Sequence, residues 1–446
     1  MPQALQPPVI VIPGITATSL RDQYPMDPER VWTPLSRQYE RICLHPENPR
    51  FERMEPARVR PDDAFNVVYS ELIQELRHNL SPAHDLPVPV YPFPYDWRRP
   101  LREAQADLLA FIGEVIDRTR LMRHYANDRP WSSDPRVNLV GHSMGGLLIA
   151  GLLADHPDAP VAKVATLGTP FRGSFEAALK IQSGMADLGT GDSGSREREA
   201  ARLMPGLYHL IPEITGSVFD DTDEARPMSL FGPGAWQPSV VQTIAQYFKL
   251  YGTRPRPDES AARTRDKSEA EKLFAALLND AKSHRRNVER LSLASTRLSP
   301  DDWLCIAGVD VTTRVELIVG EAEDGEPRFD LTTGRDNKYL DSDPDKSART
   351  GDGTVPFLGA TPRFLDRERI VCVSPHDFSY WEIGDRVMAG EGLVGFHGQL
   401  PNMDLIHRLI VTHFKEAPQG DVWGRLPPGV DEEAWRNAHP LLDLKS

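Results

Sequence analysis

The stretch Val137-Asn-Leu-Val-Gly-His-Ser143-Met-Gly-Gly-Leu-Leu-Ile-Ala150 decides the fold of this chain. An apolar run leads directly into Gly141-His-Ser-Met-Gly145, and a second apolar run of helical length follows. Strand, sharp turn and helix in this order form a nucleophile elbow, which raises a serine above the edge of a sheet. Glycines on both sides of the serine let strand and helix approach each other more closely than a Cβ would allow. The stretch therefore predicts Ser143 as a nucleophile.

Other apolar, β-branched runs alternate with amphipathic stretches along the chain. Runs of the kind that form buried parallel strands are residues 9–12, 137–140, 164–167, 304–307 and 370–373. Residues 102–123 carry apolar side chains at helical spacing. This alternation predicts the α/β class, specifically an α/β-hydrolase fold with a mostly parallel, doubly wound sheet.

The alternation stops after Ser174, so we expect four parts in a chain of 446 residues. Residues 1–175 are the first part of the core with the elbow, 176–300 an inserted, mainly helical cap or lid, 301–415 the second part of the core, and 416–446 a tail. A shorter insertion at 315–345 alternates around Glu323-Asp-Gly325, which predicts a surface hairpin.

A serine nucleophile needs a histidine to accept its proton and a carboxylate to fix the histidine tautomer. In α/β-hydrolases these follow in the chain order serine, acid, histidine. Asp352, in a turn after the fourth strand, and His397, after the last strand, satisfy this order. Asp310 and His376, each close behind a strand, are the alternative acid and base.

Two backbone N–H groups are expected to form the oxyanion hole. Met144 N–H begins the helix of the elbow, and Ile15 N–H lies in the loop after the first strand. Trp32, Tyr95 and Trp97 are candidates for the substrate pocket, because large amphipathic rings suit a cleft that holds an apolar chain beside a polar ester.

Four motifs in register resemble those of the lecithin:cholesterol acyltransferase family. They are Pro8-Val-Ile-Val-Ile-Pro-Gly14, Tyr95-Asp-Trp-Arg98, the elbow, and Leu167-Gly-Thr-Pro-Phe-Arg-Gly-Ser174. Gly351-Asp-Gly-Thr-Val-Pro356 and the segment beginning at His397 are similar to the acid and histidine motifs of that family. The resemblance covers residues 8–175 and 300–412. It implies a bacterial-type O-acyltransferase or lipase that moves an acyl group from a lipid ester, through acyl-Ser143, to an alcohol or to water.

Composition limits the kinds of partner that the protein is expected to bind. A formal net charge of −14 argues against nucleic acid, and no apolar run is long enough to span a membrane. The first eight residues show no signal peptide, so we expect a cytoplasmic protein, and three cysteines imply no disulfide framework.

No metal-ligand spacing or phosphate loop stands out in the sequence, so neither a metal nor a cofactor is predicted. The expected partner is a lipid or other ester; transient contact of the cap with a membrane surface is compatible with it, and the oligomeric state is not indicated.

Two other functions share these features. A carboxylesterase or amidase acting on a soluble substrate would use the same three residues. A non-catalytic α/β-hydrolase used for binding would not need all three, and the sequence has a nucleophile, an acid and a base.

Overall fold

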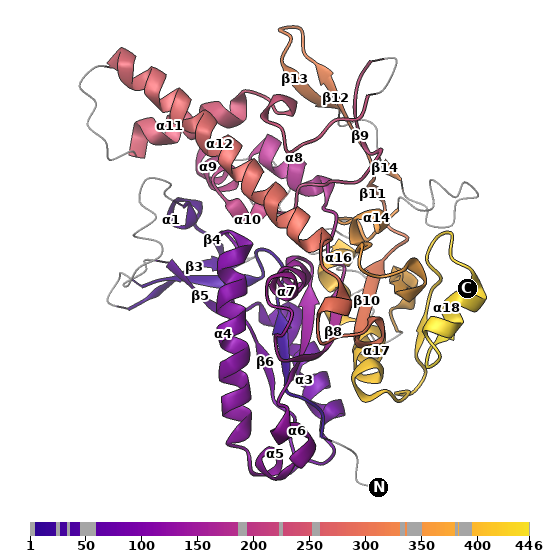
Figure 1. The fold of residues 1–446 in the computed structure, drawn as a ribbon. Helices are drawn as coiled ribbons and strands as arrows, with labels where there is room; N and C mark the ends of the chain where they lie inside the picture. The colour runs from indigo at the N-terminus through magenta and orange to yellow at the C-terminus, as the bar shows by residue number, and fades with distance from the viewer. Residues whose placement is uncertain are drawn as a thin grey trace.

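A six-stranded sheet in which every pair of neighbours is parallel forms the centre of the molecule (Figure 1). The computed structural model describes residues 5–23, 27–33, 36–44, 59–185, 194–222, 226–251, 259–330, 335–336, 350–379, 382 and 395–445. In spatial order the strands are β15 (Ile370–Val373), β10 (Trp303–Gly308), β8 (Val161–Leu167), β7 (Val137–His142), β1 (Val9–Ile12) and β6 (Val90–Pro92). All five runs predicted from the sequence lie in this sheet, and the predicted fold class is confirmed.

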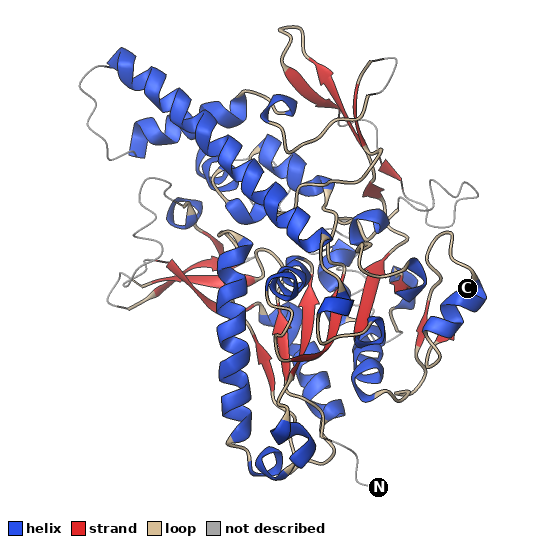
Figure 2. Ribbon diagram, in the orientation of Figure 1, coloured by secondary structure: helices blue, strands red, loops and turns tan. Residues whose placement is uncertain are grey.

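Helices cover both faces of the sheet (Figure 2). Helices α4 (Leu101–Arg120) and α7 (Met144–Asp155) share one hydrophobic core with Ile10 and Ile12 of β1. Helices α3 (Asn66–Leu80) and α17 (Asp404–Lys415) share the other core with Val9 and Val11. Because successive strand residues point to opposite faces, a strand buried on both sides must be apolar at every position. That requirement explains the unbroken apolar runs.

Residues 176–300 contribute most of a helical layer, which we call the cap. Its helices are α8 (Phe175–Ser183), α9 (Ser195–Arg202), α10 (Pro205–Tyr208), α11 (Ser239–Tyr251) and α12 (Glu259–Glu289). In Figure 1 the cap lies at the end of the molecule opposite the N-terminus. No helix in the described part of the chain is both long enough and apolar enough to cross a membrane.

The shorter insertion contains a hairpin, formed by β12 (Leu317–Glu321) and β13 (Pro327–Asp330). Residues 331–334 and 337–345 of the expected insertion lie outside the described residues. The hairpin extends to a third strand, because β12 pairs in parallel with β9 (Val218–Asp220) from the cap. The two insertions, far apart in the sequence, therefore share one small sheet.

A second sheet lies between β1 and α3 in the chain and was not predicted. It is antiparallel, with β4 (Ser36–Arg37), β3 (Glu29–Thr33), β2 (Thr18–Asp22) and β5 (Val59–Ala64) side by side. Trp32 of β3 is fully buried, and its indole N–H donates to Thr16 O at 3.0 Å. This sheet therefore positions the Trp32 ring against the loop that follows β1.

The tail covers β15, an edge strand of the central sheet. Arg425 and Cys372 exchange two backbone hydrogen bonds of 2.9 and 3.2 Å. Trp435 of α18 (Glu432–Ala438) is fully buried, and its indole N–H donates to Ile370 O at 3.0 Å. An uncovered edge would expose unpaired backbone groups to other chains, so the tail stabilises and protects the sheet.

We predict that Trp435→Ala lowers the free energy of unfolding by about 3–5 kcal/mol, because it removes a large buried side chain and leaves a cavity. Leu441, in the same tail, is 38% exposed, and Leu441→Ala should change the free energy of unfolding by less than about 0.5 kcal/mol. Urea unfolding of both variants measures the difference. Equal losses would show that the tail does not stabilise the sheet edge through Trp435.

Candidate active site

Ser143 occupies the sharp turn between β7 and α7. Its backbone angles are φ 53° and ψ −125°, a region that costs a residue with a side chain roughly 1–3 kcal/mol. Neighbouring glycines allow the close packing that maintains this turn. A Cβ on Gly145 would press into the carbonyl oxygens of Ile12 and Pro13, and one on Gly141 would lie 2.7 Å from Gly146 N. The serine side chain is thereby fixed at the carboxyl end of the sheet.

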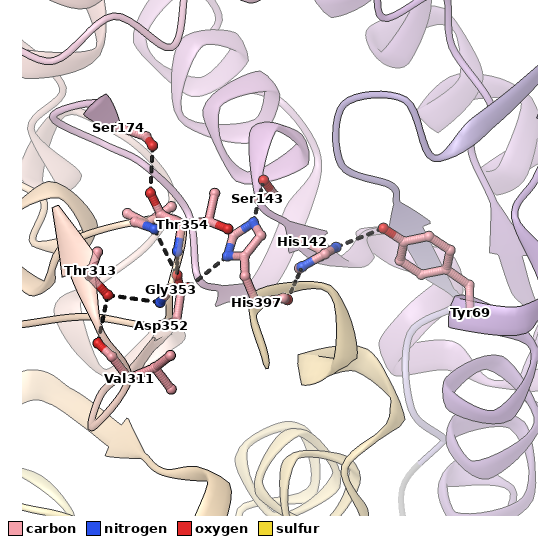
Figure 3. A network of polar contacts seen from close by, with 11 residues as sticks. Tyr69, His142, Ser143, Ser174, Val311, Thr313, Asp352, Gly353, Thr354 and His397 are labelled. Atoms are coloured by element: carbon pink, nitrogen blue, oxygen red, sulfur yellow. Dashed lines mark hydrogen bonds and ion pairs between the residues drawn. The ribbon is translucent and has the colours of Figure 1, made fainter. Parts of the chain in front are cut away.

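The structure brings Ser143, His397 and Asp352 into one hydrogen-bonded series (Figure 3). His397 Nε2 lies 2.9 Å from Ser143 Oγ, and His397 Nδ1 lies 2.6 Å from Asp352 Oδ2. His397 belongs to the short helix α16 (Gly395–Gln399) rather than to the loop expected from the sequence. Both His397 and Asp352 are buried. With its Nδ1–H donated to the carboxylate, the imidazole presents Nε2 as an acceptor for the serine hydroxyl.

The second oxygen of Asp352 is also hydrogen-bonded. Asp352 Oδ1 accepts from Thr354 N at 3.0 Å and from Val355 N at 2.7 Å. The turn itself is tied to two other segments: Gly353 N donates to Thr313 Oγ1 at 2.8 Å, and Ser174 Oγ donates to Thr354 O. Sequence reasoning missed Thr313 and Ser174, because nothing local indicates which segments meet the acid turn.

The alternative acid and base pair with each other instead. His376 Nε2 lies 3.3 Å from Asp310 Oδ2, and the His376 side chain is 65% exposed. Ser374 Oγ also donates to Asp310, at 3.1 Å. Within the described residues, neither Asp310 nor His376 is hydrogen-bonded to Ser143, so the geometry favours Asp352 and His397.

Of the two expected oxyanion donors, Met144 directly follows Ser143 in the chain and Ile15 lies in the loop after β1. Ile15 lines the same cavity as Ser143. Met144 begins α7, where the first N–H groups have no partner within the helix and the helix dipole is positive. Gly14 N–H is not available for this purpose, since it donates to Tyr69 Oη at 2.9 Å.

A cavity of about 280 Å³ opens beside Ser143 and His397. Apolar side chains from three parts of the chain line it, including Ile15, Trp32, Phe65, Val68, Leu207 and Leu210. Of the three pocket candidates, Trp32 lines this cavity, whereas Tyr95 and Trp97 do not.

Tyr95 and Trp97 are instead buried behind the cavity wall. The Tyr95 hydroxyl donates to Pro13 O at 3.0 Å, and the Trp97 indole N–H donates to Thr18 O at 2.9 Å. The Trp97 ring packs on Trp32 with centroids 5.1 Å apart. Their backbone partners, which no local pattern reveals, hold both rings away from the pocket.

Arg98 and Asp96 brace the same region. Arg98 Nε and Nη2 donate to the two oxygens of Asp96 at 2.8 and 2.7 Å, and Arg98 Nη1 donates to Ile42 O at 2.8 Å. Burial alone would raise the pKa of Asp96, but the adjacent guanidinium outweighs it and leaves that pKa below its usual value. The pair stays ionised at neutral pH and links the loop after β6 to α1 (Tyr39–Ile42).

Comparisons with known proteins agree with the fold. A family described as having the α/β-hydrolase fold matches residues 132–202, which contain the elbow. The chain has the α/β-hydrolase fold. No curated protein matches its sequence.

A solved structure resembles the chain over most of its length. A chain in the crystal structure of a Tle4–Tli4 complex has 16% identity and a TM-score of 0.58, and the match covers 93% of this chain and 99% of that one. This likeness shows the shared fold. A Bacillus licheniformis lipase (12% identity, 70% and 69% covered, TM-score 0.25) and a Staphylococcus hyicus lipase (12% identity, 93% and 97% covered, TM-score 0.34) are more distant.

We predict that Gly145→Ala destabilises the fold by about 1–3 kcal/mol and lowers esterase activity, because the new Cβ forces α7 away from β1. Gly113, in the middle of α4, is the matched control, since a Cβ there meets nothing within 4 Å. Gly113→Ala should instead stabilise the protein by about 0.5–1 kcal/mol. Thermal unfolding and ester hydrolysis measure both; a neutral Gly145→Ala would contradict the close approach.

Proposed function

We propose that the chain is an O-acyltransferase or lipase of the type seen in the lecithin:cholesterol acyltransferase family. Ser143 is the nucleophile, His397 the general base and acid, and Asp352 the carboxylate that orients His397. One observation carries the proposal: the series of contacts from Asp352 to Ser143 ends at an apolar cavity.

The reaction proceeds in two halves. Ser143 Oγ attacks the ester carbonyl while His397 Nε2 takes its proton, and Asp352 stabilises the resulting imidazolium without becoming protonated. Ile15 and Met144 N–H groups donate to the oxyanion. The leaving alcohol receives the proton from His397, which leaves an acyl group on Ser143. Water or another alcohol then attacks the acyl-enzyme, with His397 again acting as base.

The shape of the site favours a lipid ester. Leu207 and Leu210 of the cap line the apolar cavity beside Ser143, and an apolar lining suits an acyl chain. A second cavity of about 930 Å³ lies between α8 and the β12–β13 hairpin and shares Glu176, Lys180 and Thr354 with the first. The acyl chain would occupy the first cavity, and the alcohol portion of the ester would extend towards the second.

A carboxylesterase on a soluble substrate is the second candidate. The cavity beside Ser143, at about 280 Å³, is just below the roughly 300–1,000 Å³ usual for ligand sites, and this small volume favours short acyl groups. Activity on short esters that does not rise when the substrate forms micelles would favour this candidate over a lipase.

We predict that a fluorophosphonate probe labels Ser143, and that Ser143→Ala abolishes labelling and lowers kcat for ester hydrolysis by ~10⁴-fold or more. Ser132, an exposed serine of α6 (Arg129–Ser133), provides the control, and Ser132→Ala should behave like the wild type. Full labelling of the Ser143→Ala variant would exclude Ser143 as the nucleophile.

We also predict that the cap decides whether water or an alcohol receives the acyl group, since transfer requires that water be kept from the acyl-enzyme. Leu207→Ala opens the cavity and should lower the ratio of transfer to hydrolysis of the same ester. Leu203 is equally buried in the cap but does not line the cavity, so Leu203→Ala should lose similar stability and keep the ratio. If the ratio of transfer to hydrolysis is unchanged in both variants, the part of the cap around Leu207 does not decide whether water or an alcohol attacks the acyl-enzyme.

A further inference from the structure

Two buried side chains beside Ser143, Tyr69 and His142, have no part in the reaction described above. His142 Nδ1 lies 2.7 Å from Tyr69 Oη, and His142 Nε2 lies 3.0 Å from the backbone oxygen of His397 (Figure 3). Tyr69 Oη also accepts a 2.9 Å hydrogen bond from Gly14 N. Through these bonds, the loop that carries Ile15 is joined to the helix that carries His397.

The two backbone groups at the ends of this series, Gly14 N–H and His397 O, determine which atom donates in each hydrogen bond. A backbone N–H can only donate, so Tyr69 Oη accepts from Gly14 and has its own proton left to donate to His142 Nδ1. A backbone carbonyl can only accept, so His142 Nε2 carries the hydrogen that it donates to His397 O. A neutral imidazole carries one hydrogen, so neutral His142 is the Nε2–H tautomer and its Nδ1 accepts from Tyr69.

This tautomer matters because His142 lies next to a histidine that becomes charged during the reaction. The two imidazole rings have centroids 5.1 Å apart. Burial, and after it the neighbouring His397, lower the pKa of His142 to about 3, while the bond to the His397 carbonyl acts in the opposite direction. Burial also raises the pKa of Tyr69, so its hydroxyl keeps the donated proton. A neutral His142 places no positive charge against the imidazolium of His397.

We propose that Tyr69 and His142 are positioning residues for the Ser143 reaction. Together they hold the loop that carries Ile15 and the backbone of His397 in a fixed relation to the elbow. Tyr69 donates to His142 Nδ1, which leaves the hydrogen of His142 on Nε2, facing His397 O. The proposal rests on the proposed function, because it assigns these residues a role in turnover by Ser143, His397 and Asp352.

Turnover of p-nitrophenyl butyrate by the full-length chain tests the pair. Tyr69→Phe and His142→Asn should each lower kcat by roughly 10–100-fold, with KM changed less than about twofold, since misplacement of a reacting group acts mainly on the chemical step. His142→Gln should recover part of the loss, because its longer amide can still donate to His397 O. The double variant Tyr69→Phe/His142→Asn should lose no more than the poorer single variant.

A matched control is Tyr125→Phe. Tyr125, on α5 (Arg123–Asn127), is another fully buried tyrosine, and its hydroxyl donates to Gln6 O at 2.7 Å. This variant should keep wild-type kcat. Variants of Tyr69 and His142 that keep kcat, or whose losses multiply in the double variant, would overturn the proposal. A wild type without Ser143-dependent turnover would instead overturn the proposed function.

Histidine-selective ¹⁵N NMR of the wild-type chain tests the hydrogen-bonding state of His142 independently of ester turnover. Signals of His142 are assigned by their absence in His142→Gln, and we expect the Nε2–H tautomer to persist from about pH 5 to about pH 8, where an ordinary histidine titrates. Detection of the Nδ1–H tautomer, or titration of His142 in this range, would overturn the proposal even if ester turnover depends on Ser143.

Discussion

The close approach of α7 to β1 is the constraint on which the site depends. Only glycine at position 145 lets the helix start directly against the carbonyl oxygens of Ile12 and Pro13. This packing holds Ser143 at a positive φ, and its amide is tied to the neighbouring strand by a 2.8 Å bond to Leu167 O. A strained backbone persists only where its surroundings over-determine it. Here β1 and β7, which are buried at every position, and the buried start of α7 do so.

The parallel sheet then gathers residues that are far apart in the chain. Because all six strands run in one direction, the segments after β7 and β10 leave the sheet at the carboxyl ends of the strands, where Ser143 and Asp352 lie close together. His397, in α16, reaches the same end of the sheet. Burying a carboxylate is costly unless it is hydrogen-bonded, and both oxygens of Asp352 are satisfied, one by His397 and the other by two backbone N–H groups.

Much of this arrangement could be predicted because it is encoded locally or by chain order. The five apolar runs identify strands by their continuity, and the order of Ser143, Asp352 and His397 selects the residues that the structure brings together. Contacts between distant segments could not be predicted: the pairing of β9 with β12, the β2–β5 sheet, and the bond from Tyr69 to His142 depend on tertiary packing. Tyr95 was misplaced for the same reason, since its ring chemistry suits a pocket but its hydroxyl is bound by Pro13 O.

The central claim is that Ser143 carries the acyl group between donor and acceptor. Rapid acid quenching during turnover of a slowly deacylating ester, followed by mass spectrometry of proteolytic peptides, tests it most directly. Our account predicts a peptide containing Ser143 that is heavier by one acyl group, absent from Ser143→Ala, and lost when an alcohol acceptor is added before quenching. Turnover without any such adduct, or an acyl group found on another residue, would contradict it.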